Sequence, residues 1–198
     1  MHEIQATPQN IFDTDFKLSL KYPNKVKYKE LKHKHGALIT NLTENVALYL
    51  FPSELALLDD SKEKTLYYVQ FKEKPFLGRK AITQIKLWSD PVSSYTDSVF
   101  KDGMKITAYA FFKILLPKAD LILSDTQQTQ AGRRFWEKRV KDALTHSLFV
   151  YVIDRNLKTK SQITSMEEFD NIKDDLWGDS DSFLAKRIAI SHLKLWNT

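Results

Sequence analysis

Residues 119–154 constrain the fold more than any other stretch of the chain, because three elements with independent signals follow one another there. Leu121-Ile122-Leu123 is a short apolar run, which is typical of a strand covered on both faces. A second run, Phe149-Val150-Tyr151-Val152-Ile153, is rich in β-branched and aromatic residues, and between the two runs apolar residues recur at helical spacing. If the two strands pair in parallel, their crossover is right-handed. The pattern predicts a strand at 119–124, a polar turn at 125–129, a helix at 131–145 and a strand at 148–153.

The composition is that of a folded protein and excludes several kinds of chemistry. The chain has 198 residues, of which 42% are hydrophobic and 12% aromatic, enough to bury one good core. It has no cysteine, so disulfides, thiolate catalysis and thiolate metal sites are excluded. Of the five histidines, His33 and His35 lie in a lysine-rich segment and the other three are isolated in sequence, which favours solvated or capping roles over a metal site. We therefore expect no metal.

The sequence signals favour a cytoplasmic location. No apolar run approaches the roughly 18 to 20 residues that a membrane span needs, so we expect no membrane contact. The first residues, Met1-His2-Glu3-Ile4-Gln5, lack the charged-then-apolar pattern of a secretory signal. A net charge of +5 permits an anionic partner without requiring one.

The amino-terminal part of the chain predicts a basic hairpin. Residues 16–22 alternate between apolar and polar as a half-buried strand does, and the alternation resumes at 26–29 after a turn at Pro23-Asn24. From Lys17 to Lys34 there are seven lysines and a single acid, Glu30. This segment is either a contact for nucleic acid or, as we favour, the solvated face of an edge hairpin.

Further along the chain, strand signals give way to helical ones. Residues 47–90 have the character of an antiparallel meander, and 104–116 predict a helix that is apolar almost all round. A capping box that begins at Ser165 predicts a short helix at 166–174, and residues 187–191 predict a final strand. Because no linker or repeat interrupts the chain, we predict a single domain, 1–198. Its parts are a basic segment (1–35), a core (40–155) and a carboxyl-terminal helix with a strand (156–198).

Thirteen residues of this core form a recognisable motif, Ser124-Asp125-Thr126-Gln127-Gln128-Thr129-Gln130-Ala131-Gly132-Arg133-Arg134-Phe135-Trp136. The motif is similar to the S-D-x-x-Q-T-x-x-G-x-x-x-W stretch of GNAT-like proteins encoded by phages and mobile elements. The order of elements from about residue 40 to 155 also resembles the GNAT-type acyltransferases. The resemblance implies an α+β fold: a mixed, largely antiparallel sheet with a central parallel β-α-β unit and flanking helices.

The resemblance also implies a cofactor, acetyl-coenzyme A. In the family, backbone N–H groups of a glycine-rich loop hold the pyrophosphate of acyl-coenzyme A where a helix begins. The loop at 99–105 departs from the family pattern because it has one glycine, and Asp102 adds a negative charge. The residues implied to bind the cofactor are Lys101, Gly103, Met104 and Lys105.

The turn that follows residues 119–124 holds the candidate catalytic residues. Acyl transfer to an amine needs a base and a hydrogen-bond donor for the thioester oxygen, and Asp125 and Ser124 are predicted for these two roles. In an alternative without function, Asp125 is a charge near a helix start and Thr129 is the N-cap. The candidate substrate contacts are Gln127, Gln128, Thr129 and Trp88.

The sequence leaves more than one class of function open. The first is transfer of an acyl group from acyl-coenzyme A to an amine of a protein or a small molecule. The second is a non-catalytic module on the same scaffold that binds a protein or a nucleic acid, the latter through the segment from Lys17 to Lys34. A structural or assembly protein is the third. Hydrolase, NTPase and metalloprotease motifs are missing from the sequence.

Overall fold

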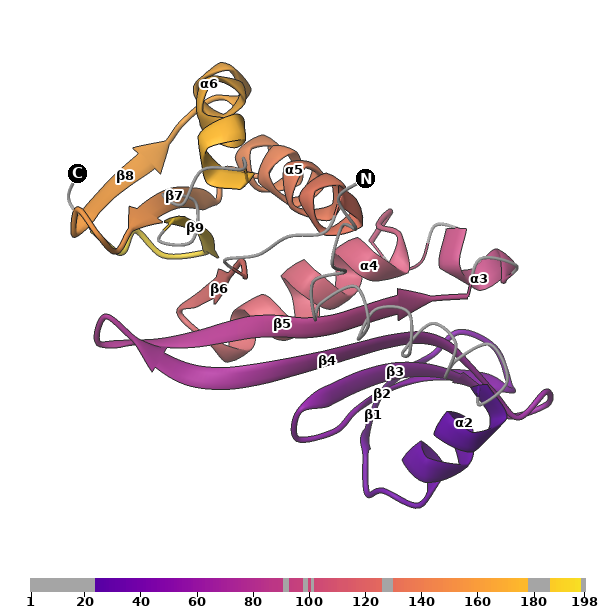
Figure 1. The fold of residues 1–198 in the computed structure, drawn as a ribbon. Helices are drawn as coiled ribbons and strands as arrows, with labels where there is room; N and C mark the ends of the chain where they lie inside the picture. The colour runs from indigo at the N-terminus through magenta and orange to yellow at the C-terminus, as the bar shows by residue number, and fades with distance from the viewer. Residues whose placement is uncertain are drawn as a thin grey trace, which may run out of the picture. The chain divides into compact units, whose positions relative to one another are not determined.

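The computed structural model describes residues 24–90, 93–97, 100, 102–125, 130–177 and 186–196 (Figure 1). These residues form an α+β fold, in which nine strands make a mixed, largely antiparallel sheet. The chain divides into two compact units. The first contains the described residues up to Gln70 and those from Lys86 to Ile106, and the second contains 71–85 and the described residues from Thr107 onward.

An antiparallel meander builds the first unit and confirms the one predicted at 47–90. Each strand from the first to the fourth pairs antiparallel with the next, and all six residues of the third strand are buried. Two long strands, the fourth and the fifth, contribute residues to both units. The strands are β1 (Ala37–Asn41), β2 (Val46–Leu50), β3 (Glu54–Asp59), β4 (Lys64–Phe76) and β5 (Arg79–Ser89).

A two-residue turn joins β4 to β5. Its residues, Leu77 and Gly78, have φ angles of 49° and 74°. Two successive residues in the left-handed region are what a tight hairpin turn of the I′ type requires, because its twist matches that of the strands. Gly78 adopts this conformation without steric cost, which explains the glycine at this point.

The prediction of a second hairpin strand at 26–29 is wrong, because Asn24–Lys32 form the helix α2. Tyr28 and Leu31, three residues apart, are both buried, whereas Val26 is 65% exposed. That spacing follows the 3.6-residue period of a helix and not the alternation of a strand. The first predicted strand, at 16–22, lies outside the described residues. The side chains that pack with α2 in one apolar cluster are Phe51, Ala56, Leu58 and Tyr68.

A helical stretch from Ile106 to Lys118 confirms the helix predicted at 104–116. It starts as α4 (Ile106–Tyr109), widens into the π-helix η1 (Ala110–Leu115) and ends in the 3-10 turn η2 (Leu116–Lys118). Pro117 lies in this last turn, and its missing N–H is one reason that the helix does not continue. Another short helix, α3 (Ser94–Asp97), belongs to the first unit.

The second unit contains the predicted strand, helix and strand, as β6 (Leu121–Leu123), α5 (Gln130–Thr145) and β7 (Phe149–Asp154). β6 pairs in parallel with β5, and β9 (Lys186–Ser191) lies antiparallel between β6 and β7. β6 and β7 therefore run in the same direction without being neighbours. The crossover through α5 thus encloses an inserted strand.

Two further elements complete this unit. No sequence signal predicts β8 (Thr159–Ile163), which pairs with β7, whereas α6 (Met166–Trp177) confirms and extends the helix predicted at 166–174. Its capping box is present: the Glu168 N–H donates to Ser165 Oγ (3.1 Å), and the Glu168 carboxylate accepts from the Thr164 N–H (2.7 Å). α5 packs against β7 and α6 (Figure 1). Hydrogen-bonded neighbours in the sheet follow the order β1-β2-β3-β4-β5-β6-β9-β7-β8.

Candidate functional site

Strands β6, β9 and β7 carry an apolar face in the second unit. Leu123 lies opposite Ala189 and Ala189 lies opposite Tyr151, so these side chains form one row across the three strands. Residues two apart along a strand share a face, which adds Leu121 and Ile153. All five side chains are buried in the same hydrophobic cluster.

The segment after β9 covers this apolar face. The Leu195 N–H donates to the Tyr151 hydroxyl (3.0 Å), and the Tyr151 and Trp196 rings meet edge to face with centroids 4.8 Å apart. Arg79 Nη2 donates to the Leu195 carbonyl (3.3 Å), and Lys160 Nζ lies 5.1 Å from the centre of the Trp196 ring. These contacts hold Leu195 and Trp196 over the apolar rows and shield them from water.

Charged residues end the apolar face where β6 ends. The Ser124 N–H donates to the Ile188 carbonyl (2.8 Å), so the pairing of β6 with β9 continues one residue beyond Leu123. Asp125 follows next along the chain, close enough to Arg187 for the two charges to act on each other. A carboxylate and a guanidinium therefore follow directly on the buried core of the unit.

Two further cations lie beside this pair. Arg155 directly follows β7, and its charge acts on Arg187. Lys74 comes from the part of β4 that belongs to the second unit, and it lies close enough to feel the charges of Asp125, Arg187 and Arg155. We call these four residues, Lys74, Asp125, Arg155 and Arg187, the charged row.

Burial shifts the pKa values of three residues of the charged row, Lys74, Asp125 and Arg187. It raises the pKa of Asp125 above its ordinary value, although the positive charges of Arg187 and Lys74 act in the opposite direction. Burial and the charge of Arg187 lower the pKa of Lys74, against the attraction of Asp125. Burial also lowers the pKa of Arg187. Perturbed groups that lie together are a common property of functional sites, so the charged row is the candidate site of this protein.

Arg187 carries donors without acceptors. Its Nε and Nη1 atoms are covered from solvent, and neither has a hydrogen-bond partner in the described part of the chain. A buried donor left unpaired costs about 1 to 3 kcal/mol, and in proteins such groups call for an explanation other than packing. The unpaired donors of Arg187 therefore lower the stability of the fold as long as no acceptor is bound to them.

Ser124 has a structural part in this site. It is 1% exposed, and its Oγ accepts a hydrogen bond from the Ile188 N–H (2.9 Å). Together with the bond from its own N–H to the Ile188 carbonyl, this contact fixes β9 beside the end of β6. The role predicted for Ser124, donation to a thioester oxygen, stays a prediction.

Replacing Ser124 by alanine is expected to lower the free energy of unfolding by about 1 to 2 kcal/mol, because the buried Ile188 N–H loses this acceptor. Urea unfolding followed by tryptophan fluorescence measures the effect. The matched control is Ser161→Ala on β8, an exposed position where the same substitution should change little. Equal effects at the two serines would show that the Ser124 contact does not hold β9.

The other predicted site residues lie elsewhere. Gly103, Met104 and Lys105 belong to the first unit, whereas Ser124 and Asp125 belong to the second. The main chain of Trp88 is part of β5, but its side chain is not among those that the structure describes. Four predicted site residues lie wholly outside the described part of the chain: Lys101, Gln127, Gln128 and Thr129.

The loop before α4 does not have the form of a phosphate cradle. Phe100 N–H donates to the Met104 carbonyl (2.6 Å), which closes the loop on itself. Asp102 and Gly103 have φ angles of 56° and 74°, so the single glycine is explained by its conformation. The exposed Asp102 carboxylate would repel a phosphate beside it. The described residues of this loop thus lack the glycine-rich form of the family's pyrophosphate cradle.

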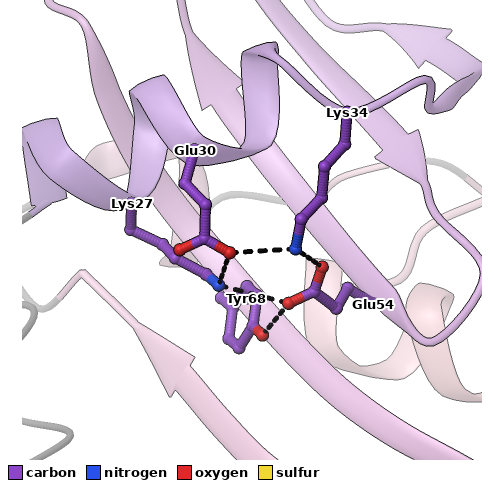
Figure 2. Close-up of polar contacts among 5 residues, drawn as sticks. All are labelled: Lys27, Glu30, Lys34, Glu54 and Tyr68. Carbon is purple, nitrogen blue, oxygen red and sulfur yellow. Dashed lines mark hydrogen bonds and ion pairs between the residues drawn. The ribbon is translucent and has the colours of Figure 1, made fainter.

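The lysine-rich segment is bound to acids of its own unit. Figure 2 shows a closed ring of ion pairs, in which Lys27 and Lys34 each contact both Glu30 and Glu54 at 2.6 to 3.1 Å. The Tyr68 hydroxyl donates to Glu54 from below this ring, and Glu54 is 6% exposed. The ring attaches α2 and the residues after it to β3 and β4. We call it the ion-pair ring.

Other lysines of the segment are also engaged. Lys25 pairs with Glu63 at 2.8 Å, and Lys32 pairs with Asp60 at 3.0 Å. A lysine held by a carboxylate must give up that partner before it can neutralise a phosphate of nucleic acid. These pairs favour a structural role for the described part of the segment over the nucleic-acid contact.

Sequence reasoning did not find Lys74, Arg155 and Arg187. Arg187 directly precedes the apolar run Ile188-Ala189-Ile190, which is predicted as a strand. A cation at the boundary of a buried strand is a usable signal, but the sequence does not show that this strand lies beside β6. Only the pairing with Ser124 brings Arg187 to Asp125.

Comparisons with known proteins found no match to this chain among the family models, the curated proteins or the solved structures. Within the described ranges, no three histidine, aspartate or glutamate side chains gather as a metal site would require. No helix in the same part of the chain has the length and apolar character to span a membrane.

Proposed function

We propose that the protein transfers an acyl group from acyl-coenzyme A to an amine, with Asp125 as the base that takes the amine proton. The position of Asp125 carries this proposal: a half-buried carboxylate with a raised pKa directly beyond the carboxyl end of β6. β6 pairs in parallel with β5, and ligands of open sheets bind beyond the carboxyl ends of parallel strands.

Asp125 has the chemistry that an amine acceptor needs. An amine is protonated at neutral pH and must lose a proton before its nitrogen can form a bond to carbon. A carboxylate attracts the ammonium group and then accepts its proton, and it does so better when its pKa lies closer to the working pH. Burial moves the pKa of Asp125 in that direction.

A second candidate function follows from the loop at 102–105. Its described residues lack the glycine-rich form that holds the phosphates of coenzyme A in the family, which favours, as the alternative, a binding module without catalysis on the same scaffold. The charged row would then hold part of a partner molecule, and Asp125 would act as a charge and not as a base. The two candidates differ in whether the protein binds an acyl donor.

Titration with acetyl-coenzyme A separates them. We expect micromolar binding by calorimetry, and mass action then raises the apparent stability by about 2 to 3 kcal/mol at a hundredfold excess over the dissociation constant. ADP at the same concentrations is the control for binding of any phosphate group. If acetyl-coenzyme A binds no better than ADP up to millimolar concentrations, acyl transfer is ruled out and the binding module stands.

A further inference from the structure

The charged row holds more positive charge than its own residues compensate. Lys74, Arg155 and Arg187 bring three positive charges against the one negative charge of Asp125, and Lys72 adds a further positive charge that acts on Lys74. Among the described residues, Asp125 is the one acid whose charge acts on Arg187. The charged row therefore has a net positive charge, which favours the binding of an anion.

Nearby acids do not supply the missing charge. The Asp154 carboxylate accepts from the N–H groups of Asn156 and Leu157 (2.9 and 3.0 Å), which ties it to the turn after β7. Asp175 lies 3.8 Å from Lys186, the neighbour of Arg187 whose side chain points to the opposite face of β9. Both acids are thus committed elsewhere.

We propose that Arg187, Lys74 and Arg155 bind a phosphate group of a ligand, with Asp125 at its side. A phosphate monoester carries a charge of about −1.5 to −2 at neutral pH, so a group of cations with one acid among them attracts it more strongly than it attracts a carboxylate, which carries a single negative charge. The planar guanidinium suits phosphate oxygens, and Arg187 still has donors to satisfy. The inference goes beyond both candidate functions, because phosphate binding needs no acyl donor.

The test is a titration of the full chain with inorganic phosphate at constant ionic strength, followed by calorimetry and by the thermal midpoint. We expect saturable binding to the native chain, and at least about tenfold weaker binding to Arg187→Gln, since a charged hydrogen-bond partner is lost. The matched control is Lys186→Gln, which removes the same charge one residue away on the other face of β9, and its affinity should stay within about twofold of the native value.

Three results would overturn the phosphate site: an equal loss in the Lys186 variant, no loss in the Arg187 variant, or an equal response to acetate. If Arg187→Gln does not fold, Lys74→Met and Arg155→Gln carry the same expectation at positions outside β9. Acetyl-coenzyme A then identifies the source of the phosphate. If the phosphate group that binds here belongs to coenzyme A, the Arg187 variant should bind both inorganic phosphate and acetyl-coenzyme A more weakly. If the phosphate group belongs to another ligand, the variant should bind acetyl-coenzyme A as the native chain does.

Discussion

Replacing Glu54 by alanine is expected to lower the free energy of unfolding by about 2 to 4 kcal/mol. Glu54 is 6% exposed and accepts from Lys27, Lys34 and the buried Tyr68 hydroxyl (Figure 2). Without it, two cations lose their innermost partner and Tyr68 loses this hydrogen bond inside the protein. Urea unfolding monitored by circular dichroism measures the change.

The titration of Glu54 supports this expectation. Burial alone would raise its pKa, but the hydrogen bonds from Lys34, Tyr68 and Lys27 outweigh burial and hold the pKa below its ordinary value. The ion-pair ring thus stabilises the charged form of a carboxylate that is nearly removed from solvent. A group of this kind contributes to stability at neutral pH, and the contribution is lost as the pH falls through its pKa in the folded state.

Glu30 provides the matched control, because it contacts the same two lysines from the solvent side of the ion-pair ring. Its side chain is 47% exposed, so Glu30→Ala should cost about 1 kcal/mol or less. The difference between the two variants isolates the effect of burial and of the Tyr68 hydroxyl. If both substitutions cost the same, the ion-pair ring is a surface feature and Glu54 has no special place in the first unit.

Local signals were sufficient for the elements of residues 119–154. The apolar run at 121–123 coincides with β6, and the helix predicted at 131–145 differs from α5 by one residue at its start. Both elements are long or apolar enough for their own residues to decide their conformation. The same holds for α6, whose start is fixed by a capping box within five residues of chain.

The helix α2 could not be predicted in the same way. Val26-Lys27-Tyr28-Lys29 satisfies the alternation of a strand as well as the start of a helix, and such a short stretch has no preference of its own. The conformation of this stretch is decided by the apolar surface on which Tyr28 and Leu31 pack. Residues far along the chain, such as Phe51 and Tyr68, build that surface. The salt partners Glu54 and Asp60 are equally remote in sequence.

The charged row shows the same limit for the site. Asp125 was predicted from the motif around it, but its partner Arg187 is brought beside it by a pairing between residues 64 positions apart. That pairing exists because β9 enters the sheet between β6 and β7. A chain read from one end to the other gives no local sign of this insertion, so three of the four charged residues were found only in the structure.

Replacing Asp125 by asparagine is expected to lower the rate of acyl transfer by about 10² to 10⁴, the range that a positioned general base contributes. Asparagine keeps the size of the side chain and its place beside Arg187 but cannot act as a base at this pH. Transfer from acetyl-coenzyme A to a panel of amines, followed by release of free thiol, measures the rate. The matched control is Asp174→Asn, an exposed aspartate on α6, which should leave the rate unchanged.

The pH dependence gives the sharper form of this expectation. A base acts only when it is deprotonated, so the native rate should rise with pH through the pKa of Asp125, which burial has raised above that of an ordinary aspartate. The amide side chain in Asp125→Asn does not titrate, so this limb of the profile must disappear in the variant. Removal of the negative charge should also strengthen phosphate binding at Arg187 and Lys74, because their attraction for an anion is no longer opposed. A variant that keeps both the rate and the acid limb would show that Asp125 is a charge partner of Arg187 and not a base.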